Sequence, residues 1–382
     1  MPTLPVREVL FVAGEASGDL HAARVADSLA AKAPDLRMTG VGGSRMQAAG
    51  VELIEDISRL AVMGFVEVLE HIPRHWLLLR RIKREILSGR PGLVVLLDYP
   101  GFNIKVAELA HKHGVPVLYY ITPQVWAWGA NRLPKLARVV TRAASILPFE
   151  EELLRKHGIA ADFVGHPLLD RAQNMPSPAV ARAHLGLKPE GPILALFPGS
   201  RRAEIDRHLG PFIDVAGEVR HRRPEVDVIL SVAPTVQIDA GSCPFPLVSA
   251  PSFVVQRAAT AGLLKSGTNT LEAAVAGLPH VIGYRTSAIT YAIAKRLVTI
   301  PNIGLVNVVA GKTVSREFVQ DALVSTDVAD ALMPLLNEAS EQRNLAVAEL
   351  DQVRMKLGSP GASVRVADII LEMLGHETNG HV

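Results

Sequence analysis

The fold of this chain is indicated by a short apolar run that ends in a glycine turn, Ile193-Leu194-Ala195-Leu196-Phe197-Pro198-Gly199-Ser200-Arg201. The five apolar residues predict a buried strand, and Glu204, Asp206 and Arg207 predict the solvent face of a helix that follows. Backbone N–H groups at the start of a helix are unpaired, so an anion fits there, and Arg201 adds a guanidinium that can grip a pyrophosphate. Taken alone, the turn is equally typical of an ordinary strand-to-helix connection with Arg201 on the surface.

A second glycine turn follows another apolar run, in Leu263-Leu264-Lys265-Ser266-Gly267-Thr268-Asn269-Thr270-Leu271-Glu272. Glu272 falls one turn inside the expected helix, where its carboxylate can accept both hydroxyls of a ribose while the N–H groups of the turn face phosphate. In isolation, the commoner role of such a glutamate is to favour the helix dipole. Together the two turns predict the two sides of one nucleotide site.

Composition limits the class of protein. The 382 residues exceed the size at which a single core stops growing, which favours two domains. A formal net charge of +2 and few aromatic residues give no reason to expect nucleic-acid binding. The single cysteine, Cys243, excludes an intrachain disulfide and a zinc site with several cysteines, which favours a reducing cytoplasm. We expect no signal peptide, and no membrane-spanning segment because prolines interrupt the longest uncharged stretches.

Apolar runs alternate with helix-like segments along most of the chain, as in residues 9–12, 93–97, 193–197 and 280–284. Non-alternating apolar strands between helices predict parallel sheets covered on both faces, the doubly wound α/β class, which binds ligands beyond the carboxyl ends of its strands. We expect a first domain over residues 1–170, a linker over 171–192, a second domain over 193–345, and C-terminal helices over 346–382 that return to the first domain. Two such domains facing a cleft would suit an activated donor in one and an acceptor in the other.

Several more specific motifs occur in order along the chain. They are Val12-Ala13-Gly14-Glu15-Ala16-Ser17-Gly18-Asp19, Gly42-Gly43-Ser44-Arg45-Met46-Gln47, Leu60-Ala61-Val62-Met63-Gly64-Phe65-Val66-Glu67-Val68-Leu69, Asp98-Tyr99-Pro100-Gly101-Phe102-Asn103, Pro123-Gln124-Val125-Trp126-Ala127-Trp128 and Phe163-Val164-Gly165-His166-Pro167. In these motifs and both glycine turns, the chain resembles the lipid-A-disaccharide synthase family, inverting glycosyltransferases of the GT-B fold in the lipopolysaccharide pathway. Two departures stand out, since family members often carry a second Asp at the position of Gly101 and usually carry Pro at that of Val306.

The resemblance implies a pair of lipid substrates. The donor would be UDP-2,3-diacylglucosamine, the acceptor 2,3-diacylglucosamine 1-phosphate, and the products UDP and a β-1,6-linked disaccharide 1-phosphate. The enzyme would work at the cytoplasmic face of the inner membrane as a peripheral protein, and a homodimer is left open. No cofactor is implied, and because no Asp-x-Asp pair occurs in the sequence, we expect no metal ion.

The resemblance also implies roles for individual residues. On the donor side these are Gly199, Ser200, Arg201, Ser266, Gly267, Thr268, Glu272, Asn307 and Gln320, and on the sugar or acceptor side Gly14, Ser17, Gly18, Asp19, Trp126 and Arg132. Asp98, at the expected end of a central strand, would be the general base. The residues by themselves leave other roles open: Asp98 in a turn before Pro100, Ser17 or Asp19 as a helix cap, and Trp126 in a core.

The segment from Val62 to Ile86 combines apolar and basic residues. Its apolar face would include Phe65, Val66, Val68, Leu69, Ile72 and Trp76, beside several arginines. That mixture suits a helix lying at an anionic membrane surface, and it equally suits a helix packed on its own sheet with a basic solvent face.

Two other functions stay open at this stage. One is a different UDP-sugar enzyme of the same fold, a UDP-N-acetylglucosamine 2-epimerase or the undecaprenyl-linked N-acetylglucosaminyltransferase of cell-wall synthesis. The other is a lipid-binding or nucleotide-binding protein without catalysis.

Overall fold

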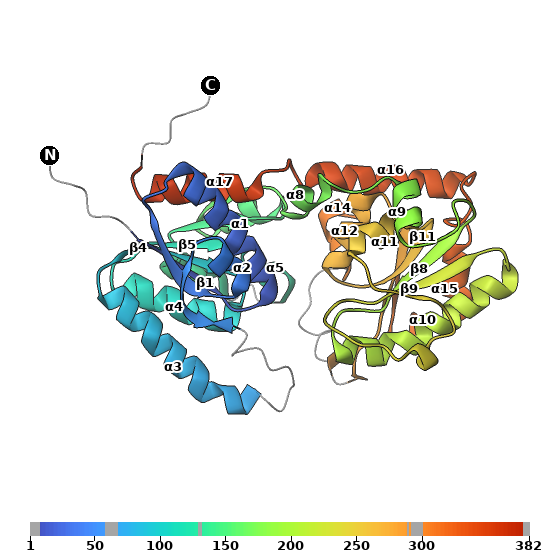
Figure 1. The fold of residues 1–382 in the computed structure, drawn as a ribbon, viewed down its shortest axis with the longest axis horizontal. Helices are drawn as coiled ribbons and strands as arrows, with labels where there is room; N and C mark the ends of the chain where they lie inside the picture. Colours follow the sequence, from blue (N-terminus) through green and yellow to red (C-terminus); the bar gives the residue numbers. More distant parts are fainter. Residues whose placement is uncertain (1–7, 58–67, 129–131, 289, 292–300, 377–382) are drawn as a thin grey trace, which may run out of the picture. The chain divides into compact units, whose positions relative to one another are not determined.

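The computed structural model describes residues 8–57, 68–128, 132–288, 290–291 and 301–376 (Figure 1). The chain divides into two compact units, residues 1–167 with 359–382, and residues 168–358. Each unit is a doubly wound α/β structure with a parallel sheet, as the apolar runs predict.

The first unit contains, among its described residues, a seven-stranded parallel sheet in the order β3-β2-β1-β4-β5-β6-β7. Its strands are β1 (Glu8–Ala13), β2 (Arg37–Gly42), β3 (Glu52–Asp56), β4 (Pro91–Leu97), β5 (Val117–Tyr120), β6 (Arg142–Ser145) and β7 (Ala160–Phe163). Its helices are α1 (Ala16–Lys32), α2 (Ser44–Ala48), α3 (Val68–Leu87), α4 (Pro100–Lys112), α5 (Val125–Trp128), α6 (Leu133–Val139), α7 (Glu150–Lys156) and α17 (Ala362–Met373).

The side chains of successive residues in each central strand lie on opposite faces of this sheet. Val9 and Phe11 of β1 pack with α1 and α17 on one face, whereas Leu10 and Val12 pack with α3, α4 and α6 on the other. In Figure 1, α17 (red) lies beside α1 (blue), although the two are far apart in the sequence. Burial on both faces explains why the strands are continuous apolar runs.

The second unit contains, in the part of the chain described, a six-stranded parallel sheet in the order β10-β9-β8-β11-β12-β13. Its strands are β8 (Ile193–Phe197), β9 (Asp227–Ser231), β10 (Leu247–Val248), β11 (Ala261–Lys265), β12 (His280–Tyr284) and β13 (Glu317–Val319). Its α-helices are α8 (Leu168–Ala172), α9 (Pro178–His184), α10 (Arg202–Arg222), α11 (Ser252–Ala258), α12 (Thr268–Ala276), α14 (Leu305–Ala310), α15 (Ser325–Leu332) and α16 (Glu341–Lys356), with the 3-10 turns η3 (Ala240–Ser242) and η4 (Gln320–Ala322).

The two faces of this second sheet are covered by different helices. Helices α10 and α15 pack on the face that holds Leu194 and Leu196, and helices α11 and α12 pack on the face that holds Ile193 and Ala195.

The unit boundaries differ from the expected ones. The stretch 171–192 is not simply a linker, because α9 begins there with a Ser177 cap and a Pro178 start and packs against α11. At the other end, α16 packs on α12 and α14 of the second unit, whereas α17 packs on α1 of the first unit. The boundary therefore falls at residues 358–359 instead of 345, in a stretch that contains Pro360 and Gly361.

A buried carboxyl group supports the short helix α5 in the first unit. Glu150 is 3% exposed, and its carboxylate accepts hydrogen bonds from Trp126 Nε1 at 2.9 Å and the Leu147 backbone N–H at 3.2 Å. Burial raises the pKa of Glu150 to about 7, although these hydrogen bonds oppose the rise.

We predict that Glu150 lowers the free energy of unfolding as the pH rises. Between about pH 4.5 and 7 the unfolded carboxyl ionises while the folded one keeps its proton, so stability falls by about 3 kcal/mol across this window and stays lower above it. Glu150→Gln should reduce this loss, measured as the free energy of unfolding of the full chain at pH 5 and pH 8. The exposed neighbour Glu152→Gln is the control, and an unchanged pH dependence in Glu150→Gln would show the prediction to be wrong.

Candidate functional site

The two glycine turns of the second unit follow neighbouring strands. Strands β8 and β11 are parallel partners, with Leu194 opposite Ala261 and Phe197 opposite Leu264. The strand order reverses between them, because β9 and β10 lie on one side and β12 and β13 on the other. This switch point is where doubly wound sheets bind ligands, and residues of both turns line one pocket there.

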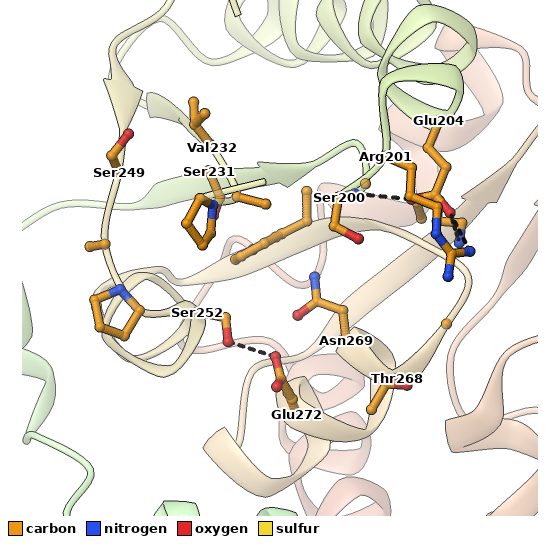
Figure 2. Close-up of a pocket in the computed structure, with 18 of the residues that line it drawn as sticks. Ser200, Arg201, Glu204, Ser231, Val232, Ser249, Ser252, Thr268, Asn269 and Glu272 are labelled. Atoms are coloured by element: carbon orange, nitrogen blue, oxygen red, sulfur yellow. Dashed lines mark hydrogen bonds and ion pairs between the residues drawn. The ribbon is translucent and has the colours of Figure 1, made fainter. Parts of the chain in front are cut away.

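A pocket of about 820 Å³ opens at this switch point. It is lined by residues from both turns and from the segments after β9 and β10, among them Gly199, Ser200, Arg201, Ser231, Val232, Ser249, Ser252, Lys265, Ser266, Gly267, Thr268 and Glu272. Figure 2 shows Ser200, Arg201 and Glu204 on one side of the hollow, Glu272 with Ser252 on another, and Ser231, Val232 and Ser249 beyond them.

The first turn is organised around Glu204. Gly199 has a φ of 134°, and a Cβ there would lie 2.6 Å from the Glu204 Cβ, so only glycine fits. Glu204 accepts hydrogen bonds from the Ser200 backbone N–H and from Lys265 Nζ, each at 2.9 Å. Burial alone would raise the pKa of Glu204, but these two donors outweigh it and the pKa is lowered. Glu204 therefore faces the pocket, and the expectation of a solvent-facing side chain was wrong.

Arg201 is the residue immediately before α10. Its side chain stays largely exposed while lining the pocket, and its Nη1 lies 3.8 Å from Glu204 Oε1. A weakly paired guanidinium at a helix N-terminus is available to an incoming anion.

Glu272 is held at the other side of the pocket by two residues that the sequence did not point to. Arg171 Nη1 donates to one carboxylate oxygen and Ser252 Oγ to the other, each at 2.6 Å. Arg171 also lies over the Phe253 ring, 5.2 Å from its centre. Both oxygens keep further lone pairs for ligand hydroxyls. No local signal could have found Arg171, since it stands 101 positions from Glu272.

The second turn is tied to the segment that contains Asn307. Gly267 has a φ of 152°, Thr268 begins α12, and Ser266 Oγ donates to the Ile303 carbonyl at 2.8 Å. Asn307 is fully buried, and its amide bonds to Val314, Ser315 and Glu317.

Asn307 and Gln320 are absent from the described lining of the pocket. The Gln320 amide is engaged with the backbone N–H and carbonyl of Thr286. Both amides are thus engaged within the protein, and their contact with the donor stays a prediction.

In the first unit, Asp98 lies in a strained turn at the end of β4. Asp98 and Tyr99 both have a φ of 47°, a left-handed conformation that costs a non-glycine residue about 1 kcal/mol or more. The buried Asn103 donates to the carbonyl oxygens of Leu97 at 3.0 Å and Asp98 at 2.8 Å, and Tyr119 donates to that of Asp98 at 2.7 Å. These hydrogen bonds therefore hold the backbone of the turn in place at the carboxyl edge of the sheet.

The loop after β1, the strand next to β4, contains the other expected acceptor-side residues. A Cβ at Gly14 would lie 2.2 Å from the Tyr99 ring, so glycine is needed for this ring to pack. Ser17 is exposed and Gly18 is buried, both in the first turn of α1. Asp19 is buried, and its carboxylate accepts the backbone N–H groups of Gly43, Arg45 and Met46 at the start of α2. Asp19 thus caps α2 and not its own helix α1, whose start has no side-chain cap, and its acceptor-side role stays a prediction.

Trp126 and Arg132 flank a gap in the described residues. Trp126 is half-buried, bonds Glu150 and packs edge-on against Phe149 at 5.0 Å between ring centres. Arg132 is exposed before α6. The side chain of Trp128 lies outside the described part of the structure.

Helix α3 contains the described part of the expected membrane-facing segment. Leu78, Ile82 and Ile86 are buried against the sheet, whereas Trp76 and Leu77 are 51% and 54% exposed. The Arg80 guanidinium stacks on Trp76 at 3.3 Å. Phe65 and Val66, and the side chains of Val68, Leu69 and Ile72, lie outside the described residues.

Two further features follow from the described residues alone. None of the helices described is both long and apolar enough to cross a membrane. No group of three or more His, Cys, Asp or Glu side chains among them could hold a metal ion.

Comparisons with solved structures agree with the fold. The glycotransferase of kitacinnamycin matches 96% of this chain and 98% of its own length with a TM-score of 0.63 and 15% identity. The UDP-GlcNAc 2-epimerase of Methanocaldococcus jannaschii, solved in complex with UDP-GlcNAc and UDP, matches 96% of this chain and 99% of its own length with a TM-score of 0.62 and 12% identity. At these identities the likeness shows the fold, and the predicted GT-B class of paired Rossmann-like domains is confirmed.

Comparisons of sequence are more specific. The family model described as Lipid-A-disaccharide synthetase matches residues 9–360. The lipid-A-disaccharide synthase of Geobacter metallireducens is 42% identical over 98% of this chain and 99% of its own length. The chain belongs to the lipid-A-disaccharide synthetase family.

Proposed function

We propose that this protein transfers 2,3-diacylglucosamine from UDP-2,3-diacylglucosamine to the 6-hydroxyl of 2,3-diacylglucosamine 1-phosphate, giving UDP and the β-1,6-linked disaccharide 1-phosphate. The observation that carries the proposal is one pocket with the Arg201 turn on one side and the Glu272 carboxylate on another. Family membership supports the synthesis of a lipid A disaccharide.

The chemistry of the pocket orients the nucleotide. The diphosphate would lie by Arg201 and the Ser266–Thr268 turn, where cationic and N–H donors gather, and the ribose hydroxyls would bond Glu272. The uracil would then occupy the side formed by residues 231–234 and 249–251, which has no charged side chains. The complex of the Methanocaldococcus jannaschii epimerase with UDP supports a nucleotide-sugar donor for this fold.

We predict that Arg201→Ala weakens UDP binding about tenfold to a hundredfold, because a charge-assisted contact to the diphosphate is lost, and leaves uridine binding unchanged. Titration calorimetry of the full chain measures both. Arg202→Ala is the matched control, since the neighbouring Arg202 is exposed and paired with Asp206. Equal effects of the two variants would contradict the assignment.

The chemical step requires a base and a stabilised leaving group. The acceptor oxygen attacks the anomeric carbon, the bond from that carbon to the UDP oxygen breaks, and the hydroxyl proton passes to a carboxylate. We assign the carboxylate to Asp98, because the strained turn that contains it is held by Asn103 and Tyr119 at the carboxyl edge of the first sheet. Arg201 would stabilise the negative charge on the departing UDP.

We predict that the purified protein releases UDP and the disaccharide 1-phosphate from the two diacyl substrates, and that Asp98→Asn lowers this turnover by about 10²-fold to 10⁴-fold with UDP affinity unchanged. Product analysis by mass spectrometry and UDP titration measure the two effects. The control is Glu108→Gln, which replaces an exposed carboxylate of α4 that is paired with Lys135. A reaction that releases neither UDP nor the disaccharide 1-phosphate would reject the function, and near-normal turnover of Asp98→Asn would reject only the base.

The lipid substrates require contact with a membrane surface. We place this contact on α3, whose outer face exposes Trp76 and Leu77 beside basic residues while its inner face packs on the sheet. Apolar burial and attraction to anionic lipids add together on such a helix. The protein would then work peripherally at the cytoplasmic face of the inner membrane.

We predict that replacing Trp76 and Leu77 together with Ser lowers binding to vesicles of phosphatidylethanolamine and phosphatidylglycerol at least tenfold, since two exposed apolar side chains that would insert into the lipid are lost. Co-sedimentation of the full chain with the vesicles measures this. Leu345→Ser, which changes an exposed leucine of α16, is the matched control. Unchanged vesicle binding of the double variant would exclude this face of α3.

A further inference from the structure

Lys265 is a cation of the candidate site that the sequence motifs did not single out. It ends β11, only 19% of its side chain is exposed, and it lines the same pocket as Arg201. Its Nζ lies 3.6 Å from the position that a Cβ at Gly267 would occupy, which places the ammonium against the second glycine turn. Arg201 belongs to the first turn, so the two cations come from the two neighbouring strands of the switch point.

The partner of Lys265 creates an electrostatic problem for an anionic ligand. Glu204 Oε1 lies 2.9 Å from Lys265 Nζ, while its Oε2 accepts the Ser200 backbone N–H. A negative charge therefore sits on the turn where a diphosphate would bind. Two like charges a few ångströms apart repel strongly in a partly buried pocket, so this carboxylate needs a compensating cation for any diphosphate to enter.

Lys265 has the geometry to compensate. An ammonium group has three N–H donors, and the bond to Glu204 uses one of them. Arg201 is a poorer counter-ion for Glu204, because its nearest nitrogen is 3.8 Å from the carboxylate and its side chain is largely exposed.

We propose that Lys265 is a further donor-binding residue, whose ammonium neutralises Glu204 and at the same time donates to the diphosphate of the bound nucleotide. The proposal rests on the function proposed above for this pocket. In this arrangement Glu204 orients the lysine and the Ser200 N–H, and Lys265 turns an otherwise repulsive carboxylate into part of a diphosphate cradle. The same ammonium would stabilise charge as UDP departs.

Calorimetric titration of the full chain with UDP and with uridine tests the proposal. Lys265→Met should weaken UDP binding about tenfold or more and leave uridine binding unchanged, because only the diphosphate meets the ammonium. Lys265→Arg should restore most of the UDP affinity. Lys265→Met combined with Glu204→Gln should recover part of it, because the glutamine removes the repulsive charge and keeps an oxygen for the Ser200 N–H. The matched control is Lys312→Met, which replaces an exposed lysine that is paired with Glu349.

Three results would overturn the proposal. UDP affinity of Lys265→Met equal to that of the unmodified protein, with Arg201→Ala still impaired, would exclude Lys265 and leave the proposed function standing. Equal losses for UDP and uridine would assign Lys265 a purely structural role. If the unmodified protein bound no UDP, the function proposed for the pocket would fail together with the inference.

Discussion

The parallel pairing of β8 with β11 is the constraint on which the candidate site depends. Because the strand order reverses between these strands, the chain leaves β8 toward α10 on one face of the sheet and leaves β11 toward α12 on the other. Both helices begin at the edge where the pocket opens, at Arg202 and Thr268. Their N-termini each present a partial positive charge and unpaired N–H groups to the same space. Residues about 70 positions apart are thus brought to one pocket by backbone topology alone.

The charges in this pocket are arranged so that each carboxylate has its own cation. Glu204 is paired with Lys265 and Glu272 with Arg171, whereas Arg201 has only a distant contact with Glu204. Three cations against two carboxylates leave an excess of positive charge beside two helix N-termini. Paired carboxylates are fixed in position, so they can accept ligand hydroxyls or orient a cation without cancelling the attraction for phosphate. This division separates the side that suits a diphosphate from the side that suits a ribose.

The sequence predicted the parts of this arrangement that depend on local pattern. The apolar run 193–197 is β8 residue for residue, and the turn before α10 follows it, because a strand buried on both faces needs a continuous apolar run. Contacts between residues far apart in the sequence could not be predicted from local pattern, as the contact of Arg171 with Glu272 illustrates. Periodicity assigned Glu204 to solvent because it counts helical positions and cannot register a side chain that turns back to a preceding backbone N–H. The resemblance predicts that Asn307 and Gln320 lie beside the donor, and in the structure their amides bond to the protein's own backbone.

The first unit shows how backbone geometry can position a carboxylate at the carboxyl edge of a sheet. Asp98 and Tyr99 occupy the left-handed region in succession, at a combined cost of about 2 kcal/mol or more, and such strain persists only where the surroundings impose it. Asn103 and Tyr119 impose it here by donating to main-chain carbonyl oxygens, which the turn keeps whichever side chain stands at position 98. Gly14 contributes by leaving room for the Tyr99 ring. Asparagine tolerates the left-handed region best among the close analogues of aspartate, so exchanging the carboxylate for an amide at this position changes the chemistry while the support of the turn stays in place.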